Sequence, residues 1–380
     1  MKNQNRKRPL AILVGLNLFF ITLVVHLPIR AEQNEERHSV EGLAPDVRGD
    51  ESRLKYQKGD LVVVPIPTSD PTLGSGLIGA GAYFYSQTEH QKKTQPASMT
   101  AAAAMYTNNN SKAGGIAQLN YWDQDAWRFT GVLGYVDLKL EVLTPEDTAS
   151  GDNVNWNIEG MFSQIRISRR IRGDWYASTG LRYIDFKQTL GETPPGRDIS
   201  RETVTAGVEL GIEFDSRDLP MNPYTGRLFR ATALFNDDSL GGDDTYTSYR
   251  ASLRSYHQFS EPLVLAWEIA GCKKAGDFPL WDACRLPLRG FASTDYLGET
   301  GFHAQAEARW RISPRWGLVG FAGVGTIGNS FSREREHEPV PSYGMGIRFM
   351  VLKSKRINLR LDYGRSLQSD AVYISVGEAF

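Results

Sequence analysis

Histidine is the residue type best suited to acid–base chemistry near neutral pH, and this chain has six. His303 lies close in sequence to two carboxylates, Asp295 and Glu299, and an acid–histidine pair beside a serine would suit a hydrolase. No serine motif accompanies the pair, and the other histidines fall in polar stretches or near predicted strand ends. We therefore expect a satisfied or solvated histidine and predict no catalytic residue. A lipase remains a third hypothesis, testable by loss of phospholipid hydrolysis in His303→Ala.

Cys272 and Cys284 are the two cysteines of the chain. In an oxidising compartment an isolated pair favours a disulfide over two free thiols. The bond would close a short loop and stabilise the fold by about 3 kcal/mol in the chain-entropy model. A metal site is not expected at two cysteines without a nearby histidine.

An acidic run is the remaining group that could bind an ion. Its spacing lacks the pattern of a calcium loop, so a solvated, repelling loop is the better interpretation. We predict no metal and no other cofactor. The run consists of Asp237, Asp238, Asp243 and Asp244.

The first 31 residues indicate the compartment. Lys2, Arg6, Lys7 and Arg8 form a positive region, and residues 10–25 are almost wholly apolar before the chain turns polar at Arg30. This pattern predicts a signal peptide over residues 1–31, with an uncleaved anchor as the alternative. Residues 32–58 are charged and polar and are expected to form a flexible lead-in.

Alternating segments run from residue 59 to residue 380. In residues 203–214 every second side chain is apolar, and residues 302–312 and 356–363 alternate in the same way. A period of two is that of a β-strand. These segments reach about ten residues, enough to cross a bilayer at a tilt, whereas soluble strands average about 5–6 residues. Full charges on the polar faces suit a wet lumen better than the dry core of a soluble sandwich, the alternative.

The sequence thus predicts an all-β fold, a transmembrane antiparallel β-barrel over residues 59–380. Fifteen segments starting at Ser75 are predicted to be strands, and barrels of this type have even numbers. We place the sixteenth in residues 61–67, with fourteen strands as the alternative. Short turns alternate with longer connections, the longest at residues 274–298, and Phe380 falls on the short-turn side.

Three features converge on one family. Leu288-Arg289-Gly290-Phe291 lies in the longest connection with five strands after it, Asp215-Ser216-Arg217-Asp218 forms a turn three strands earlier, and the chain ends in an aromatic residue. Together these resemble the BamA/TamA-type bacterial surface antigen family of outer-membrane insertases and translocases, over roughly residues 60–380.

The resemblance implies that the long loop folds into the lumen and sets its arginine against an acidic residue of the wall. Here Arg289, Gly290 and Phe291 would form that lock, with Glu307 as the partner carboxylate. Bidentate geometry would then fix the loop in place. We predict that Arg289→Ala and Glu307→Ala each loosen the loop and that the double variant is no worse than either.

Two departures from the family qualify this expectation. Other members have an aspartate in a Phe-x-Asp-x-Gly motif, whereas residues 321–325 of this chain read Phe-Ala-Gly-Val-Gly, with Gly323 in the aspartate's place. Glu307 is therefore expected to act alone or to leave a looser loop. The family also carries periplasmic domains of about seventy-odd residues, and a lead-in of this length is too short for one. A separate periplasmic partner would supply that function.

The last ten residues resemble the signal by which the assembly machinery recognises barrel clients, through strand addition to an exposed edge. The residues that carry it would be Tyr373, Gly377 and Phe380. Alternation places Phe380 on the apolar face with Val372 and Val376, and Glu378 interrupts that face.

The expected function is therefore non-enzymatic: a role in outer-membrane biogenesis or transport, in the outer membrane of a Gram-negative bacterium. The expected partners are lipid and the assembly machinery, and the barrel is expected to be a monomer. With a net charge of −1, nothing indicates nucleic acid. The alternative is a passive pore whose lumen arginines favour anions: Arg230, Arg254, Arg309, Arg348 and Arg360.

Overall fold

The computed structural model describes residues 59–143, 153–191, 199–219, 222–292, 294–330, 338–353, 356–367 and 369–380. The expected signal peptide (1–31) and lead-in (32–58) lie outside the described residues. Among the helices in these ranges, none is long and apolar enough to span a membrane.

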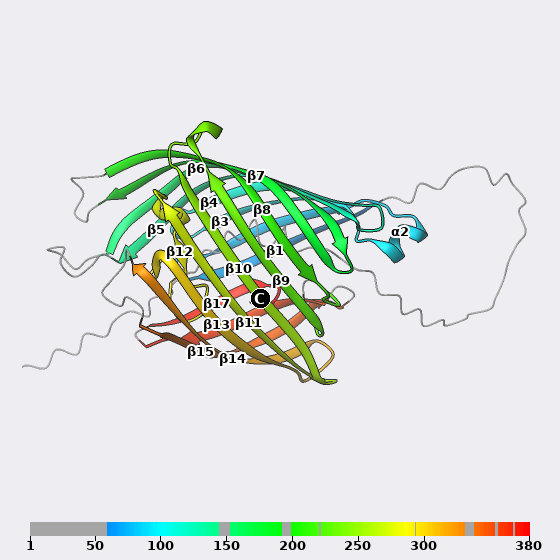
Figure 1. Cartoon of the computed structure of the whole chain (residues 1–380). Coiled ribbons are helices and arrows are strands. Elements are labelled where there is room, and N and C mark those ends of the chain that lie inside the picture. Colours follow the sequence, from blue (N-terminus) through cyan, green and yellow to red (C-terminus); the bar gives the residue numbers. More distant parts are fainter. Residues whose placement is uncertain are drawn as a thin grey trace, which may run out of the picture.

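Sixteen strands of the described chain form a closed antiparallel barrel, in which each strand pairs with its neighbours in sequence (Figure 1). The wall strands are β1 Asp60–Asp70, β2 Gly74–Phe84, β3 Met99–Thr107, β4 Lys112–Trp122, β5 Trp127–Leu143, β6 Asn153–Arg172, β7 Trp175–Gly191, β8 Ile199–Asp215, β9 Gly226–Asn236, β10 Tyr246–Ser260, β11 Leu263–Gly276, β13 Leu297–Arg311, β14 Trp316–Ser330, β15 Val340–Leu352, β16 Ile357–Arg365 and β17 Asp370–Val376. The shorter elements are α2 Glu89–Thr94, the 3-10 turns η1 Asp238–Leu240 and η2 Leu280–Asp282, and the two-residue strand β12 Cys284–Arg285.

The predicted strand count is confirmed. β1 covers the expected residues 61–67, and β2 begins at Gly74, one residue before the expected Ser75. The alternative count of fourteen strands is therefore wrong. Tight turns such as 123–126, 173–174 and 261–262 lie at one end of the barrel, called here the short-turn end. The β9–β10 and β11–β13 connections lie at the other, the long-loop end.

The outer face of the barrel is apolar, as the alternation predicts. Large side chains such as Leu77, Ile116, Leu181 and Met345 are more than half exposed in the isolated chain, and such a surface suits contact with lipid. Exposed tryptophans gather at the short-turn end, a position typical of a membrane interface. They are Trp122, Trp127, Trp175, Trp310 and Trp316.

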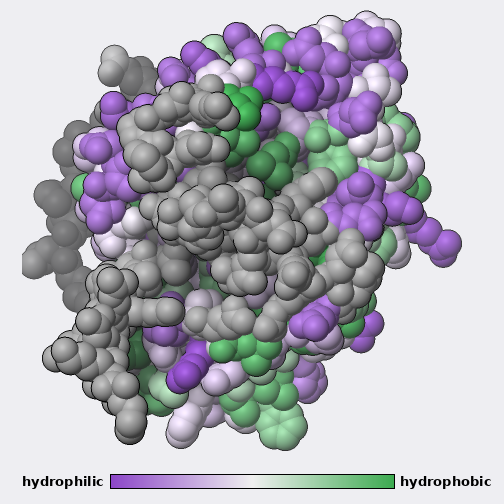
Figure 2. Space-filling view, turned by 90° about the vertical axis from the view of Figure 1, so that its left-hand side faces the viewer, coloured by the Kyte–Doolittle hydropathy of each residue, from purple (hydrophilic) through white to green (hydrophobic). Residues whose placement is uncertain are grey.

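The inner face differs between the two halves of the barrel. Along β8–β17 it carries buried charges such as Glu209, Glu268, Glu307 and Arg348. Along β2–β7, toward the long-loop end, it is apolar. Figure 2 looks onto that end, where hydrophilic residues gather around the rim. The buried apolar residues of β2–β7 include Ile78, Met99, Met105, Leu119, Val136, Leu138, Leu140, Trp156, Ile158, Phe162, Ile184 and Phe186.

The prediction of a uniformly wet, charged lumen is therefore wrong for this half. The outer face of the same strands is also apolar. Both faces of these strands are therefore apolar: one contacts lipid and the other lines the interior. A period of two is still visible in these strands only because glycine, alanine and a few polar residues interrupt the run of large apolar side chains.

The seam between the first and last strands is short. β1 pairs with β2 without interruption from Asp60 to Asp70, but its ladder with β17 consists of the single pair Ser69 and Ile374. An unbroken ladder to β2 requires that Pro65 and Pro67, which lack N–H groups, direct their nitrogens away from β2. The nitrogens of both prolines therefore point to the edge of β1 that faces the seam.

The end of the chain leaves the wall. β17 ends at Val376 and Gly377 adopts φ +90°, a left-handed conformation that favours glycine. After this turn Phe380 is buried against Tyr256 and Ala266. The prediction that Phe380 shares the apolar outer face with Val376 is thus wrong, because strand alternation stops at the turn.

Candidate functional site

The connection between β11 and β13, residues 277–296 and called here the β11–β13 segment, is held against the inner face of the barrel. It contains η2 and β12, and β12 pairs with β13 through Cys284–Gly298 and Arg285–Leu297. The predicted disulfide is confirmed: Cys284 of β12 is bonded to Cys272 of β11. The interior of the segment is thereby attached covalently to β11 of the wall.

Arg289 lies at the centre of the contacts between this segment and the wall. Its Nη1 donates to Oδ2 of Asp362 at 2.8 Å, and its Nη2 lies 2.5 Å from Oε1 of Glu307, an ion pair without hydrogen-bond geometry. The guanidinium stacks on the ring of Phe321 at 3.4 Å. A buried cation with two carboxylates and an aromatic face gains directional contacts that water would otherwise supply.

Of the two alternatives expected, that Glu307 acts alone or that the loop is looser, the first is wrong. Asp362 of β16 supplies a second carboxylate, from the position that the alternation of residues 356–363 had already placed on the polar face. The reason that Gly323 lacks a side chain is also visible. A Cβ there would lie 2.9 Å from Cβ of Gln305 and 3.0 Å from Cδ2 of Leu288, so the neighbouring strand and the segment together crowd the space that an aspartate would need.

Gly290 and Phe291 are fixed through their backbones. The N–H of Gly290 donates to the Tyr373 hydroxyl at 2.8 Å, and that hydroxyl donates to the carbonyl of Phe291 at 3.1 Å. The Gly290 carbonyl accepts from Ser369 Oγ at 2.8 Å. Tyr373, expected to matter as part of a C-terminal signal, thus contacts the segment, and nothing in the sequence pattern predicted this contact.

Gly290 also brings two backbones into contact. It adopts φ +112°, and a Cβ on it would lie 2.6 Å from the carbonyl carbon of Arg365. The facing Gly364 is equally restricted, because its Cβ would lie 2.8 Å from the nitrogen of Gly290. Glycine at both positions lets the segment approach β16 at backbone distance.

The ion pairs continue from Arg289 to the end of the chain. Glu307 also accepts from Arg309 Nε at 2.8 Å, and Arg309 donates to the Phe380 carbonyl at 3.0 Å. Arg348 contacts Asp362 and donates to Glu378 at 2.8 Å. Glu378 is therefore buried among these groups and does not interrupt an outer apolar face as expected. We call Arg289, Glu307, Arg309, Arg348, Asp362 and Glu378 the terminal network.

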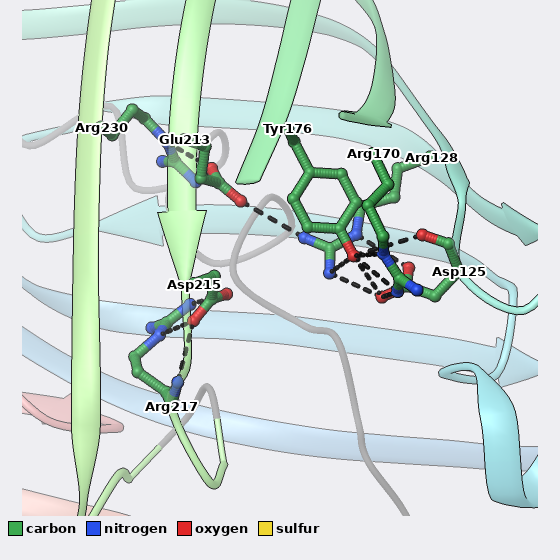
Figure 3. Close-up of polar contacts among 8 residues, drawn as sticks. All are labelled: Asp125, Arg128, Arg170, Tyr176, Glu213, Asp215, Arg217 and Arg230. Carbon is green, nitrogen blue, oxygen red and sulfur yellow. Dashed lines mark hydrogen bonds and ion pairs between the residues drawn. The ribbon is translucent and has the colours of Figure 1, made fainter. Parts of the chain in front are cut away.

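A second group of charges lies on the inner face at the short-turn end (Figure 3). Asp125 pairs with Arg128 at 2.7 Å and with Arg170 at 3.2 Å, and Tyr176 donates to Asp125 at 2.8 Å. Glu213 joins Arg128, at 3.3 Å, to Arg230, at 2.5 Å. The side chains shown come from β5–β9 and their turns, and each cation drawn has an acidic partner.

The histidine singled out by the sequence has a partner other than its two acidic neighbours in sequence. His303 is buried, and its Nε2 lies 3.2 Å from Oε2 of Glu268. Gln305 donates to the same oxygen at 2.7 Å. Neither Asp295 nor Glu299 supplies the contact, because alternation directs His303 to the inner face, where β11 carries Glu268.

Comparison with known proteins identifies the family. A sequence profile described as the Omp85 superfamily domain matches residues 98–375. The chain belongs to the Omp85 superfamily. No curated protein matches it by sequence.

Solved structures of BamA and CdiB share its fold. BamA from Haemophilus ducreyi lacking POTRA domains 1–3 superposes with a TM-score of 0.57 at 12% identity, over 84% of this chain and 69% of that one. CdiB from Acinetobacter baumannii gives 0.58 at 13% identity, over 84% and 60%. CdiB from Escherichia coli gives 0.61 at 10%, over 83% and 62%. At such identities the likeness concerns the fold, and this Omp85 chain spans about 60 to 69% of those chains.

Proposed function

We propose that this protein acts in outer-membrane biogenesis or transport in a Gram-negative bacterium, and that the seam between β1 and β17 is its working part. The observation that carries the proposal is the contrast between that seam, one residue pair, and the uninterrupted ladder of β1 with β2. Superfamily membership supports an insertase or translocase type of activity.

The energetics of the seam follow from its hydrogen bonds. A closed barrel removes free strand edges, and each missing ladder bond leaves an edge group to be satisfied in another way. With one pair to break, separation of β1 from β17 costs far less than separation of any other two wall strands. A seam that opens before the rest of the barrel would expose a strand edge to lipid or to a client chain.

The β11–β13 segment has a supporting role in this proposal. We infer that the contacts of Arg289 with Glu307 and Asp362, and those of Gly290 and Phe291 with Tyr373, hold β13, β16 and β17 together on one side of the seam. The last strand would then move as one body with its neighbours while β1 separates from it.

The alternative of an anion-selective pore is less well supported. Each of the five arginines on which the pore hypothesis rested lies beside a carboxylate, and four of them are within hydrogen-bond distance of it. The distances are 2.5 Å for Arg230–Glu213, 2.6 Å for Arg254–Glu268, 2.8 Å for Arg309–Glu307, 2.8 Å for Arg348–Glu378 and 3.9 Å for Arg360–Asp362. Paired charges add little net positive potential to a passage.

A cross-link across the seam tests the proposal. Ser69→Cys with Ile374→Cys would join β1 to β17, since paired residues on neighbouring strands lie within reach of a disulfide. In liposomes that contain the protein, folding of an added client barrel should be faster than in empty liposomes. Oxidation, which forms the cross-link, should abolish that acceleration, and reduction of the cross-link should restore it.

The matched control shares one of the two changes. Ser69→Cys with Ser75→Cys joins β1 to β2, where the native hydroxyls already lie 3.0 Å apart, and leaves the seam free. It should accelerate folding as the native chain does. If the seam cross-link forms fully and the acceleration is unchanged, the seam is not the working part. If the native chain accelerates nothing, the insertase form of the proposal fails.

Partners follow from the same proposal. The assembly machinery would fold this barrel, and a separate periplasmic protein would recruit clients to it. Co-purification from membranes under mild detergent, followed by identification of the bound chains, addresses both.

A further inference from the structure

The apolar half of the lumen contains a cavity. Its walls are inner-face side chains of β2–β7, and its cover is formed by Leu280, Trp281 and Leu297 around the β11–β13 segment. Trp281 packs edge-on against Phe186 with ring centroids 5.1 Å apart. The cavity is tight: it has about 80 Å³ of room for water-sized molecules, and the 1120 Å³ between the atoms that bound it includes open solvent. Its apolar walls include Met105, Val136, Leu138, Trp156 and Phe162.

Such a space is poorly suited to water. An ordered buried water needs two to four polar partners, which the aliphatic and aromatic walls away from Asp282 and Arg285 do not offer, and apolar cavities take up apolar molecules instead. An unbranched alkyl chain, which can bend to follow a tight apolar space, suits these walls better than a rigid ring system. Each buried methylene of such a chain adds to the affinity.

One end of the cavity is charged, with cations in excess. Asp282 lies at this end and receives three of them: Lys274 at 2.8 Å, Arg182 at 2.9 Å and Arg250 at 3.3 Å. Arg285 also lines the cavity and donates to the carbonyl of Trp281 at 3.1 Å.

The charge state of this end is set by its surroundings. Burial by itself raises the pKa of Asp282, but Arg182, Lys274 and Arg250 outweigh burial and hold that pKa well below its usual range. Burial and the neighbouring Arg250 lower the pKa of Arg285 to about 10, so its guanidinium is charged at neutral pH. Even with Lys274 left out, Arg182, Arg250 and Arg285 outnumber Asp282, so the cluster favours an added anion.

Two further polar groups belong to the cavity. Among the described residues, the indole N–H groups of Trp156 and Trp281 are buried without a hydrogen-bond partner, and both residues line the cavity. A buried donor left unpaired destabilises the folded state. A ligand that brings oxygen atoms into the cavity would offer acceptors to such groups.

We propose that this cavity binds a long-chain fatty acid, with its alkyl chain among the β2–β7 side chains and its carboxylate at the Arg285 end. The chain matches the tight apolar walls, and the carboxylate matches the excess of cations around Asp282. The proposal does not depend on the seam, because the cavity lies among β2–β7 and is covered by the β11–β13 segment.

Binding is measured by fluorescence quenching with 9,10-dibromostearate. The full chain is refolded from denaturant, so that it carries no cellular lipid, and held in an amphipathic polymer, so that no bilayer or detergent competes. Bromine quenches nearby tryptophans, and Trp281→Phe should remove much of the saturable quenching. The methyl ester of the same acid should bind at least tenfold more weakly than the acid.

A pair of neighbouring residues provides the matched variants. Ala103 lines the cavity, whereas Ala104 of the same strand is exposed on the outer face. Ala103→Phe should weaken binding at least tenfold, and Ala104→Phe should leave it within about twofold of the native value. Arg285→Gln should reduce the preference for the acid over its ester. Folding of each variant is checked by its heat-dependent mobility on a gel.

Three results would overturn the proposal. These are quenching that does not saturate, a folded Ala103→Phe variant that binds as the native chain does, and equal binding of acid and ester. If Ala103→Phe does not fold, Trp281→Phe decides, because unchanged saturable quenching in that variant places the ligand elsewhere.

Discussion

At the scale of single residues, Gly290 shows how one missing side chain lets the β11–β13 segment meet the wall. Its φ of +112° and its contact with the backbone of Arg365 both exclude a Cβ. Gly241 offers a comparison, since it adopts φ +91° and a Cβ on it would meet nothing within 4 Å. Substitution of either glycine strains the backbone, but only substitution of Gly290 also creates a steric clash.

We predict that Gly290→Ala destabilises the fold by several kcal/mol, whereas Gly241→Ala costs about 1 kcal/mol. Equilibrium unfolding in urea, in micelles, measures both free energies. Equal losses in the two variants would show that the close approach to Arg365 is not maintained.

The pairing of Arg289 is tested by a double-mutant cycle. Arg289→Ala and Glu307→Ala should each destabilise the β11–β13 segment, and the double variant should lose about 1–3 kcal/mol less than the sum. The sequence predicted a double variant no worse than either single one. Because Glu307 also binds Arg309 and Arg289 also binds Asp362, a part of each loss remains independent. Strict additivity in unfolding free energy would mean that the two side chains do not interact.

At the scale of elements, the disulfide attaches β12 to β11 at one side of the segment, and the Arg289 contacts hold the other side. Replacing both Cys272 and Cys284 by Ser should lower the free energy of unfolding by about 3 kcal/mol. It should also make residues 277–296 cleavable by an added protease while the wall remains intact. Reduction of the native protein serves as the control and should give the same cleavage; protection equal to that of the oxidised protein would contradict the prediction.

The sequence predicted the elements well because a spanning strand must alternate along its whole length, as residues 203–214 do. The sequence prediction failed where the alternation ends and where both faces of a strand are apolar. Phe380 was misplaced because Gly377 turns the chain inward, and the apolar inner face of β2–β7 was missed because both faces there are apolar. Asp362 was on the predicted polar face, but a contact across many residues of sequence, such as that with Arg289, has no local signal.

At the scale of the whole molecule, described side chains contact one another on the inner face toward both ends of the barrel. The β11–β13 segment packs on the inner face, and paired charges around Asp125 and Glu213 lie at the short-turn end. In planar bilayers we therefore predict no steady conductance of the size that an open sixteen-stranded pore would give. The control is a porin inserted under the same conditions. Long-lived, anion-selective steps from the native chain would favour the pore hypothesis.

The two prolines of β1 set a limit on what can join this barrel. A strand that approached the free edge would find amide hydrogens at Leu61 and Val63, none at Pro65 and Pro67, and Ser69 already paired with β17. Any guest would therefore be held over a short stretch and released easily, and two copies of the barrel would gain little by joining edge to edge.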